Sequence, residues 1–238
     1  MKRLIALAPY GTTFESKHPL FFSALNRLFE TDFWEDCLVT KIPESAVKSM
    51  ILNPNNWLEC PPPLAIGSIV GSFDQRELTP DQLQHILASA NVTAEPETQP
   101  QIDTRHSDGM FGRHAPYWHI DFDPSNLPRF DILTVAFSES AFGGTVYLSL
   151  PRFNTDCINQ YIKTDAAHES NPILESIQHI LEELLRVDAD SDWLKTYIHH
   201  TIPNEIYKNI TQDYFHKSPD LMYPRVLFIV GIPKPYAG

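Results

Sequence analysis

The sequence is poor in glycine and cysteine. Its 238 residues include only 9 glycines, with none between Gly144 and Gly231. The three cysteines, Cys37, Cys60 and Cys157, are far apart and form no C-x-x-C pair. An odd number of scattered cysteines argues against a disulfide framework and favours reduced thiols, so we expect a cytoplasmic protein.

Positive charge is also scarce. Lys and Arg number 18 against 30 Asp and Glu, which gives a formal net charge of −12. Such a balance argues against a nucleic-acid partner, because neutralising phosphates requires Lys and Arg. A small molecule, a peptide or a protein is therefore the expected substrate class. The sequence does not indicate an oligomeric state.

Several familiar signals are missing. No apolar run approaches the roughly 20 residues of a membrane span, so none is expected. The apolar start ends at Pro9 after five residues, too short for a signal peptide. The chain has no H-E-x-x-H and no G-x-S-x-G, which argues against a zinc protease and an α/β-hydrolase.

What is present is a globular composition, 42% hydrophobic and 11% aromatic. Apolar residues at helical spacing predict helices over residues 18–30 and 172–187. Thr79 followed by Pro80 predicts a helix start. Residues 92–107 are polar and carry prolines, which predicts a loop and the boundary between two regions.

The residues before and after that loop differ in character. Residues 1–105 are expected to form a mixed α/β support region, and residues 106–238 a β-rich core, together making one continuous globular unit. Strand-like runs in the second region cover residues 114–122, 130–137, 145–150, 192–201 and 224–230. Residues 211–219 are expected to form a loop.

A histidine and an aspartate lie two residues apart in the first of these runs. In a strand, residues i and i+2 point to the same side, so His119 and Asp121 would face one direction. Such a pair can supply two ligands of an iron(II) site of the two-His, one-carboxylate type. The alternative is a buried histidine with a hydrogen-bonded aspartate. A second H-x-D, at residues 106–108, lies in a polar run and is interpreted as a loop.

The residues that follow resemble a known family. The H-x-D pair precedes the apolar run 131–137 and then Gly-Gly-Thr-Val-Tyr-Leu at residues 143–148. This order is similar to that of the iron(II)- and 2-oxoglutarate-dependent oxygenases. The resemblance implies a mainly β fold with flanking helices around a double-stranded β-helix, or jelly-roll, core.

The resemblance also implies particular site residues. His200, in the sequence His-Thr-Ile-Pro, is similar to the family's second histidine, so His119, Asp121 and His200 are the expected catalytic iron ligands. Arg225 opens an apolar run, as does the family residue that binds the far carboxylate of 2-oxoglutarate. An arginine suits that task because its planar fork can bind both carboxylate oxygens.

Two further residues, Tyr147 and Thr134, are expected to help hold 2-oxoglutarate. The implied reaction uses Fe(II), 2-oxoglutarate as co-substrate and O2. It releases succinate and CO2 while oxidising an unactivated C–H bond, in most cases by hydroxylation.

Some features depart from the family pattern. His200 and Arg225 are 25 residues apart, where about half that spacing is usual, and His199 competes with His200 as a ligand. His168, His179 and His216 are assigned to the surface. Two alternatives remain: a cupin-like metal protein that does not use 2-oxoglutarate, and a non-catalytic jelly-roll binding module.

Overall fold

The fold is taken from a computed structural model that describes residues 13–31, 44–92, 99–107, 117–120, 130–154, 156–157, 172–208, 214–219 and 223–233. Its contacts divide the chain into two units. The first contains residues 1–59 and 151–194, and the second contains residues 60–150 and 195–238. The boundary predicted at residues 105 and 106 falls inside a strand of the second unit.

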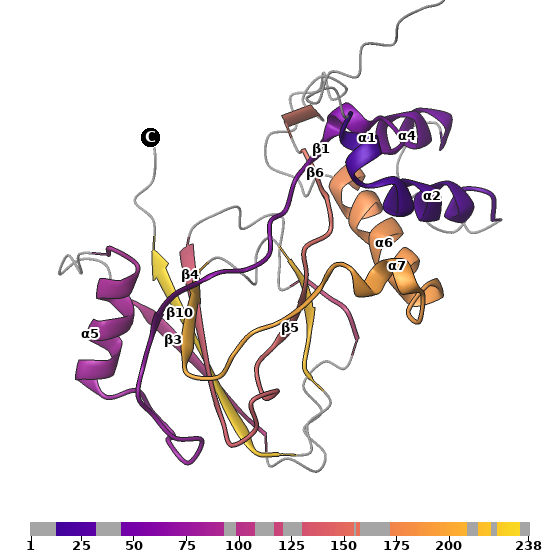
Figure 1. Ribbon diagram of the computed structural model, residues 1–238. Helices are drawn as coiled ribbons and strands as arrows, with labels where there is room; N and C mark the ends of the chain where they lie inside the picture. The colour runs from indigo at the N-terminus through magenta and orange to yellow at the C-terminus, as the bar shows by residue number, and fades with distance from the viewer. Residues whose placement is uncertain are drawn as a thin grey trace, which may run out of the picture. The chain divides into compact units, whose positions relative to one another are not determined.

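The first unit is mainly helical (Figure 1). Its helices are α1 (Phe14–Lys17), α2 (Pro19–Leu28), α4 (Glu44–Ile51), the 3-10 turn η1 (Pro54–Asn56), α6 (Pro172–Val187) and α7 (Asp192–Lys195). A two-stranded sheet pairs β1 (Trp57–Leu58) with β6 (Arg152–Phe153). The helices predicted over residues 18–30 and 172–187 are confirmed as α2 and α6.

The apolar faces of the helices meet around an aromatic cluster. Trp57 packs edge-on against Phe21, with ring centroids 5.1 Å apart, and against Phe153 at 5.4 Å. The Trp57 indole N–H donates to the Ile51 carbonyl at 2.6 Å, so its polar atom is satisfied inside the core.

The second unit contains two larger antiparallel sheets. One has the strand order β2 (Ala65–Ser68), β8 (Glu205–Lys208), β4 (Phe130–Ser138), β10 (Arg225–Pro233), β3 (Gln101–Ser107). The other has the order β7 (Ile198–His200), β5 (Val146–Leu148), β9 (Phe215–Lys217). A bridge between His119 and His216 adds residues 117–120 beside β9. The expectation of a mainly β protein with a few helices is confirmed.

One face of the five-stranded sheet is covered by helix α5 (Pro80–Ser89), as Figure 1 shows. Alternate residues of β10, including Val226 and Phe228, pack with Phe137 of β4 and with Ile86 of α5. The predicted start of this helix is confirmed, since Thr79 and Gln82 form a complete capping box.

The opposite face of the five-stranded sheet carries the strand residues that alternate with those packed against α5. Strand residues alternate in direction, so Arg225 of β10 and Thr134 of β4 lie on the face away from α5. Tyr207 pairs with Thr134 and shares this face. It forms a buried cluster with Tyr147 of β5, which shows that this face is turned toward the three-stranded sheet.

Three segments differ from the prediction. Residues 101–107, expected to be a loop, form strand β3, and residues 215–217 form strand β9 inside the segment 211–219 that was also expected to be a loop. Residues 192–201, expected to be one strand, form helix α7 and then strand β7. Strand β3 is mostly polar and β9 has only three residues, so neither shows an apolar alternation in the sequence. They form strands because neighbouring strands supply their backbone pairing.

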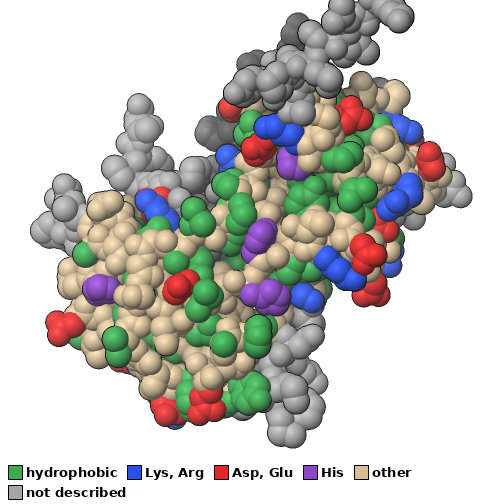
Figure 2. Space-filling model, viewed as in Figure 1, with side chains coloured by type: hydrophobic (Ala, Val, Ile, Leu, Met, Phe, Trp, Pro, Cys, Tyr) green, Lys and Arg blue, Asp and Glu red, His purple; other side chains and the backbone are tan. Residues whose placement is uncertain are grey.

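The described surface does not carry a broad basic patch on the face drawn in Figure 2, where acidic, basic and hydrophobic side chains are intermixed. Among the described helices, none combines the length and apolar character needed to cross a bilayer.

Gly144 offers a direct test of how the two-sheet unit is closed. A Cβ at this position would lie 1.7 Å from the Thr201 carbonyl oxygen, a backbone atom that cannot rotate away. We expect Gly144→Ala to lower the free energy of unfolding by about 1–3 kcal/mol, the range for overpacking a buried site. Gly231→Ala is the control, because its nearest contact is an ordinary 3.4 Å. Equal stability of the two variants in urea denaturation would contradict this account.

Candidate functional site

A row of four side chains crosses the three-stranded sheet. His119 pairs with His216, His216 with Tyr147, and Tyr147 with His199. Two backbone hydrogen bonds hold the first pairing. The His119 N–H donates to the His216 carbonyl at 3.0 Å, and the His216 N–H donates to the His119 carbonyl at 2.8 Å. Directly opposed residues of antiparallel strands project to the same face, so all four side chains share one face of this sheet.

The His119 and His216 imidazoles lie side by side, with ring centroids 4.3 Å apart and planes inclined by 48°. In each ring Nδ1 faces the carbonyl oxygen two residues earlier, Tyr117 O at 2.9 Å and Tyr214 O at 3.2 Å. A carbonyl only accepts, so Nδ1 carries the proton and the Nε2 lone pair of the neutral ring can bind a metal. Metal-ligating histidines commonly donate their second N–H in this way.

His216 was expected on the surface, and that prediction is wrong. The residue is 6% exposed, because β9 lies between β5 and residues 117–120. A sequence signal existed in its spacing: His216 precedes Arg225 by nine residues, whereas His200 precedes it by 25.

His200 lies elsewhere. It pairs with Val146 of β5, one residue away from the row of His119, and its side chain is exposed. The strand alternation therefore places His200 on the opposite face of the sheet from His119 and His216. The register does not bring His200 together with His119 and His216.

His199 shares the face of His119 but not its neighbourhood. Two strand spacings separate it from His216, about 10 Å. Its Nε2 hydrogen-bonds to Ser149 Oγ at 2.8 Å. Burial, with a smaller effect of His200, lowers the pKa of His199, which favours the neutral ring. This histidine is satisfied within the sheet.

Asp121, the expected carboxylate ligand, lies outside the described residues, two positions after His119. Within the described part of the chain, no three His, Cys, Asp or Glu side chains gather closely enough to hold a metal. The described residues thus bring two imidazoles together on one face of the sheet.

Arg225, the expected co-substrate anchor, is buried at the start of β10 with 4% of its surface exposed. Nη1 donates to the Gly143 carbonyl at 3.3 Å and to Thr145 Oγ1 at 3.4 Å, and Nη2 donates to Ser218 Oγ at 3.3 Å. All three acceptors are neutral and all three bonds are long. No carboxylate forms an ion pair with Arg225 among the described residues.

The surroundings of Arg225 disfavour its charge. Burial lowers the pKa of Arg225 to about 10, while Tyr147 acts in the opposite direction and Arg105 adds a repulsion. The guanidinium is still charged at neutral pH. A buried cation without an anionic partner is costly, so this position is suited to an anionic ligand.

The guanidinium and the histidine pair are close neighbours along the small sheet. Ser218 follows His216 by two residues, and Thr145 precedes Tyr147 by two residues. Two residues of extended chain span about 7 Å. A small molecule with a metal-chelating end and a carboxylate end could therefore reach both groups.

The other two expected co-substrate residues differ in position. Tyr147 is 1% exposed, its ring lies 5.6 Å from that of His216, and it is close enough to Arg225 to affect its pKa. Thr134 is buried on the same face as Arg225 but pairs with Ile229, four residues further along β10. The structure brings Tyr147 to the site and places Thr134 about 13 Å along the sheet from the row of Arg225.

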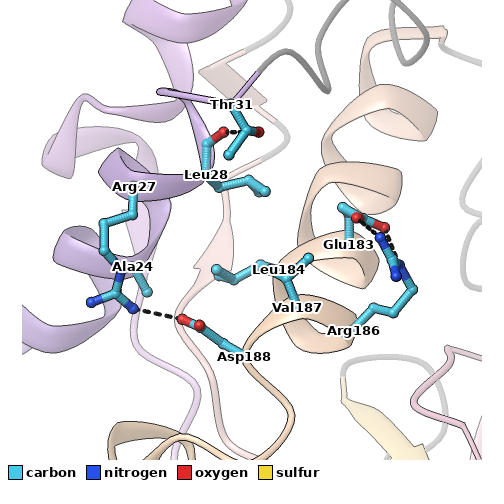
Figure 3. Close-up of a pocket in the computed structure, with 9 residues that line it drawn as sticks. All are labelled: Ala24, Arg27, Leu28, Thr31, Glu183, Leu184, Arg186, Val187 and Asp188. Atoms are coloured by element: carbon cyan, nitrogen blue, oxygen red, sulfur yellow. Dashed lines mark hydrogen bonds and ion pairs between the residues drawn. The ribbon is translucent and has the colours of Figure 1, made fainter.

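A cavity of about 440 Å³ lies in the helical unit, between α2 and the end of α6 (Figure 3). Its charged lining residues are already paired: Arg27 Nη2 binds Asp188 Oδ2 at 2.7 Å, and Arg186 binds the Glu183 carboxylate. No histidine or cysteine is among its lining residues. Its chemistry does not compete with the histidine and arginine cluster as a functional site.

Comparison with known proteins adds no family: neither a protein-family model nor a curated protein matches this chain.

The cost of burying Arg225 can be measured directly. A pKa near 10 corresponds to a charged form disfavoured by roughly 3 kcal/mol. We expect Arg225→Met to raise the free energy of unfolding of the ligand-free protein by about 1–3 kcal/mol, as when buried ions are replaced by apolar side chains. Lys17→Met is the control, since both partners of the Lys17–Glu59 pair are exposed and its loss should barely change stability. Destabilisation by Arg225→Met in chemical denaturation would show that the neutral acceptors fully compensate the charge.

Proposed function

We propose that this chain is an iron(II)- and 2-oxoglutarate-dependent oxygenase. In this proposal Nε2 of His119, Nε2 of His216 and the Asp121 carboxylate bind the iron, and Arg225 binds the far carboxylate of 2-oxoglutarate. The observation that carries it is a buried arginine with no carboxylate partner among the described residues. It contacts Ser218, which lies about 7 Å along the chain from His216 and its neighbour His119.

The strand connectivity supports a jelly-roll core. Counting residues 117–120 as a strand, the described part of the second unit after β2 and α5 contains eight strands in chain order: β3, 117–120, β4, β5, β7, β8, β9 and β10. The first pairs with the last, the second with the seventh, the third with the sixth, and the fourth with the fifth. Such nested pairing is expected when a long hairpin rolls into two sheets, as in a jelly roll, and it supports this part of the proposal.

The donor set fits iron(II). Two neutral imidazoles and one carboxylate form the facial triad typical of non-haem iron oxygenases and leave coordination positions for other ligands. When bound, iron and 2-oxoglutarate supply an oxidative decarboxylation that yields succinate and CO2 and oxidises a substrate C–H bond. The chain's own residues hold and orient these groups: the carbonyls of Tyr117 and Tyr214 fix the imidazoles, and Arg225 fixes the diacid.

Arg225 also favours this proposal over a cupin-like protein that does not use 2-oxoglutarate. Such a protein would need the histidines but has no use for a buried guanidinium beside them. A non-catalytic module would need neither. The cation is the feature that an anionic co-substrate explains.

The choice of histidines gives a sharp test. Removing a direct ligand should cost at least as much as the 10–100-fold typical of outer-shell changes, so we expect His216→Ala and His119→Ala to weaken iron(II) binding by about 100-fold or more. His200→Ala is the matched control on the opposite face and should bind iron as the parent does. Anaerobic equilibrium dialysis measures all three affinities.

Two results would contradict the assignment. If His200→Ala loses iron and His216→Ala keeps it, the ligand set includes the outer face of β7 and the register argument fails. If none of the three substitutions changes iron affinity, the metal site lies elsewhere in the chain.

A further inference from the structure

A second row of side chains crosses the five-stranded sheet at Arg225. Arg225 pairs with Ser107 of β3 on one side and with Ser138 of β4 on the other. The three side chains share the face turned toward the small sheet, because opposed residues project together. The arginine is thus flanked by two serine hydroxyls.

The two hydroxyls differ in their hydrogen bonding. Ser138 Oγ donates to the Pro224 carbonyl at 3.1 Å and accepts from Ser140 N–H at 3.2 Å. Ser107 Oγ is buried and has no hydrogen-bond partner among the described residues. Ser107 as a whole is 5% exposed. A buried hydroxyl without a partner is destabilising, and such groups commonly mark a site that something else completes.

Arg225 does not hydrogen-bond to Ser107. The Cβ atoms of opposed residues lie about 5 Å apart, yet the guanidinium bonds instead to Gly143, Thr145 and Ser218. A guanidinium has donors only, so it offers no acceptor for the proton of the Ser107 hydroxyl. An acceptor with two oxygens would serve both groups. Arg105, two residues before Ser107 on the same face, is paired with Asp103 at 3.0 Å, so Arg225 is the cation of this corner that no described carboxylate neutralises.

We propose that Ser107 is a positioning residue of the anion site, and that its hydroxyl donates a hydrogen bond to the carboxylate that Arg225 binds. The identity of that carboxylate as one end of 2-oxoglutarate rests on the proposed function. The unliganded protein carries the unsatisfied hydroxyl as a cost in stability, and the ligand removes it. Strand β3, at the edge of the sheet, is thereby coupled to occupancy of the site.

The proposal predicts opposite behaviour of the two serines. Ser107→Ala removes an unsatisfied group, so the midpoint of thermal unfolding of the ligand-free protein should stay the same or rise, while 2-oxoglutarate binding weakens. Ser138→Ala removes a satisfied group, so the midpoint should fall and binding should be unchanged. A purely structural role of Ser107 would not produce this pattern.

The experiment compares the parent, Ser107→Ala, Ser107→Thr, Ser138→Ala and Arg225→Lys as full chains. Calorimetric titration of the anaerobic iron(II)-loaded proteins with 2-oxoglutarate gives the dissociation constants, and thermal unfolding without ligand gives the midpoints. We expect Ser107→Ala to raise the dissociation constant about tenfold or more, as for a hydrogen bond to a charged group. Ser107→Thr, which keeps the hydroxyl, should recover most of the affinity.

The outcomes separate the two proposals. An unchanged dissociation constant in Ser107→Ala, with weaker binding in Arg225→Lys, would overturn the role of Ser107 and leave the co-substrate anchor in place. Unchanged binding in both variants would overturn the anchor itself, and with it the proposed function. A lower midpoint for Ser107→Ala than for Ser138→Ala would show that Ser107 is bonded in the folded protein, which also overturns the proposal.

Discussion

The buried guanidinium of Arg225 is the constraint on which the site depends. A cation between two sheets must be met by acceptors, and the small sheet supplies them through the Gly143 carbonyl, Thr145 Oγ1 and Ser218 Oγ. The Gly-Gly-Thr sequence makes this approach possible. Gly144 lies against the Thr201 backbone, where any side chain would collide. The Thr145 backbone N–H donates to Thr201 Oγ1 at 2.8 Å.

Strand register then decides which groups face the arginine. The alternation of side chains along β9 and β7 turns His216 inward and His200 outward, although both are plausible ligands by residue type. The same rule groups Arg225 with Ser107 and Ser138 and turns Val226 toward α5. A shift of one residue in either sheet would separate the histidines from the guanidinium, so the site is specified by the pairing rather than by any single loop.

The parts that could be predicted from sequence are those with strong local signals. Helix α6 has five apolar residues at helical spacing, α5 has a capping box, and β4 and β10 are apolar runs buried by their neighbours. The Gly-Gly-Thr-x-Tyr motif and the arginine that opens an apolar run are also local patterns, so they could be recognised in the sequence. Both Tyr147 and Arg225 lie at the candidate site. Asp121 falls outside the described residues, so its role stays a prediction.

The missed parts are short or polar strands whose pairing comes from the rest of the sheet. Strand β3 is an edge strand with mostly polar side chains, so residues 101–107 resembled a loop, and Ser107 was hidden with them. Strand β9 has three residues, and its backbone partners lie about 70 and 100 positions earlier in the chain. No local pattern reports such distant contacts, and the nine-residue spacing of His216 from Arg225 is a weak signal on its own, so His216 was assigned to the surface.

We propose that one diacid bridges the iron held by His119 and His216 and the guanidinium of Arg225. The most direct test is an anaerobic titration of the iron(II)-loaded protein with 2-oxoglutarate, followed in the visible range. We expect the weak charge-transfer band of a chelated keto acid, saturating at one 2-oxoglutarate per chain. Iron binding without such a band at any 2-oxoglutarate concentration would contradict the account.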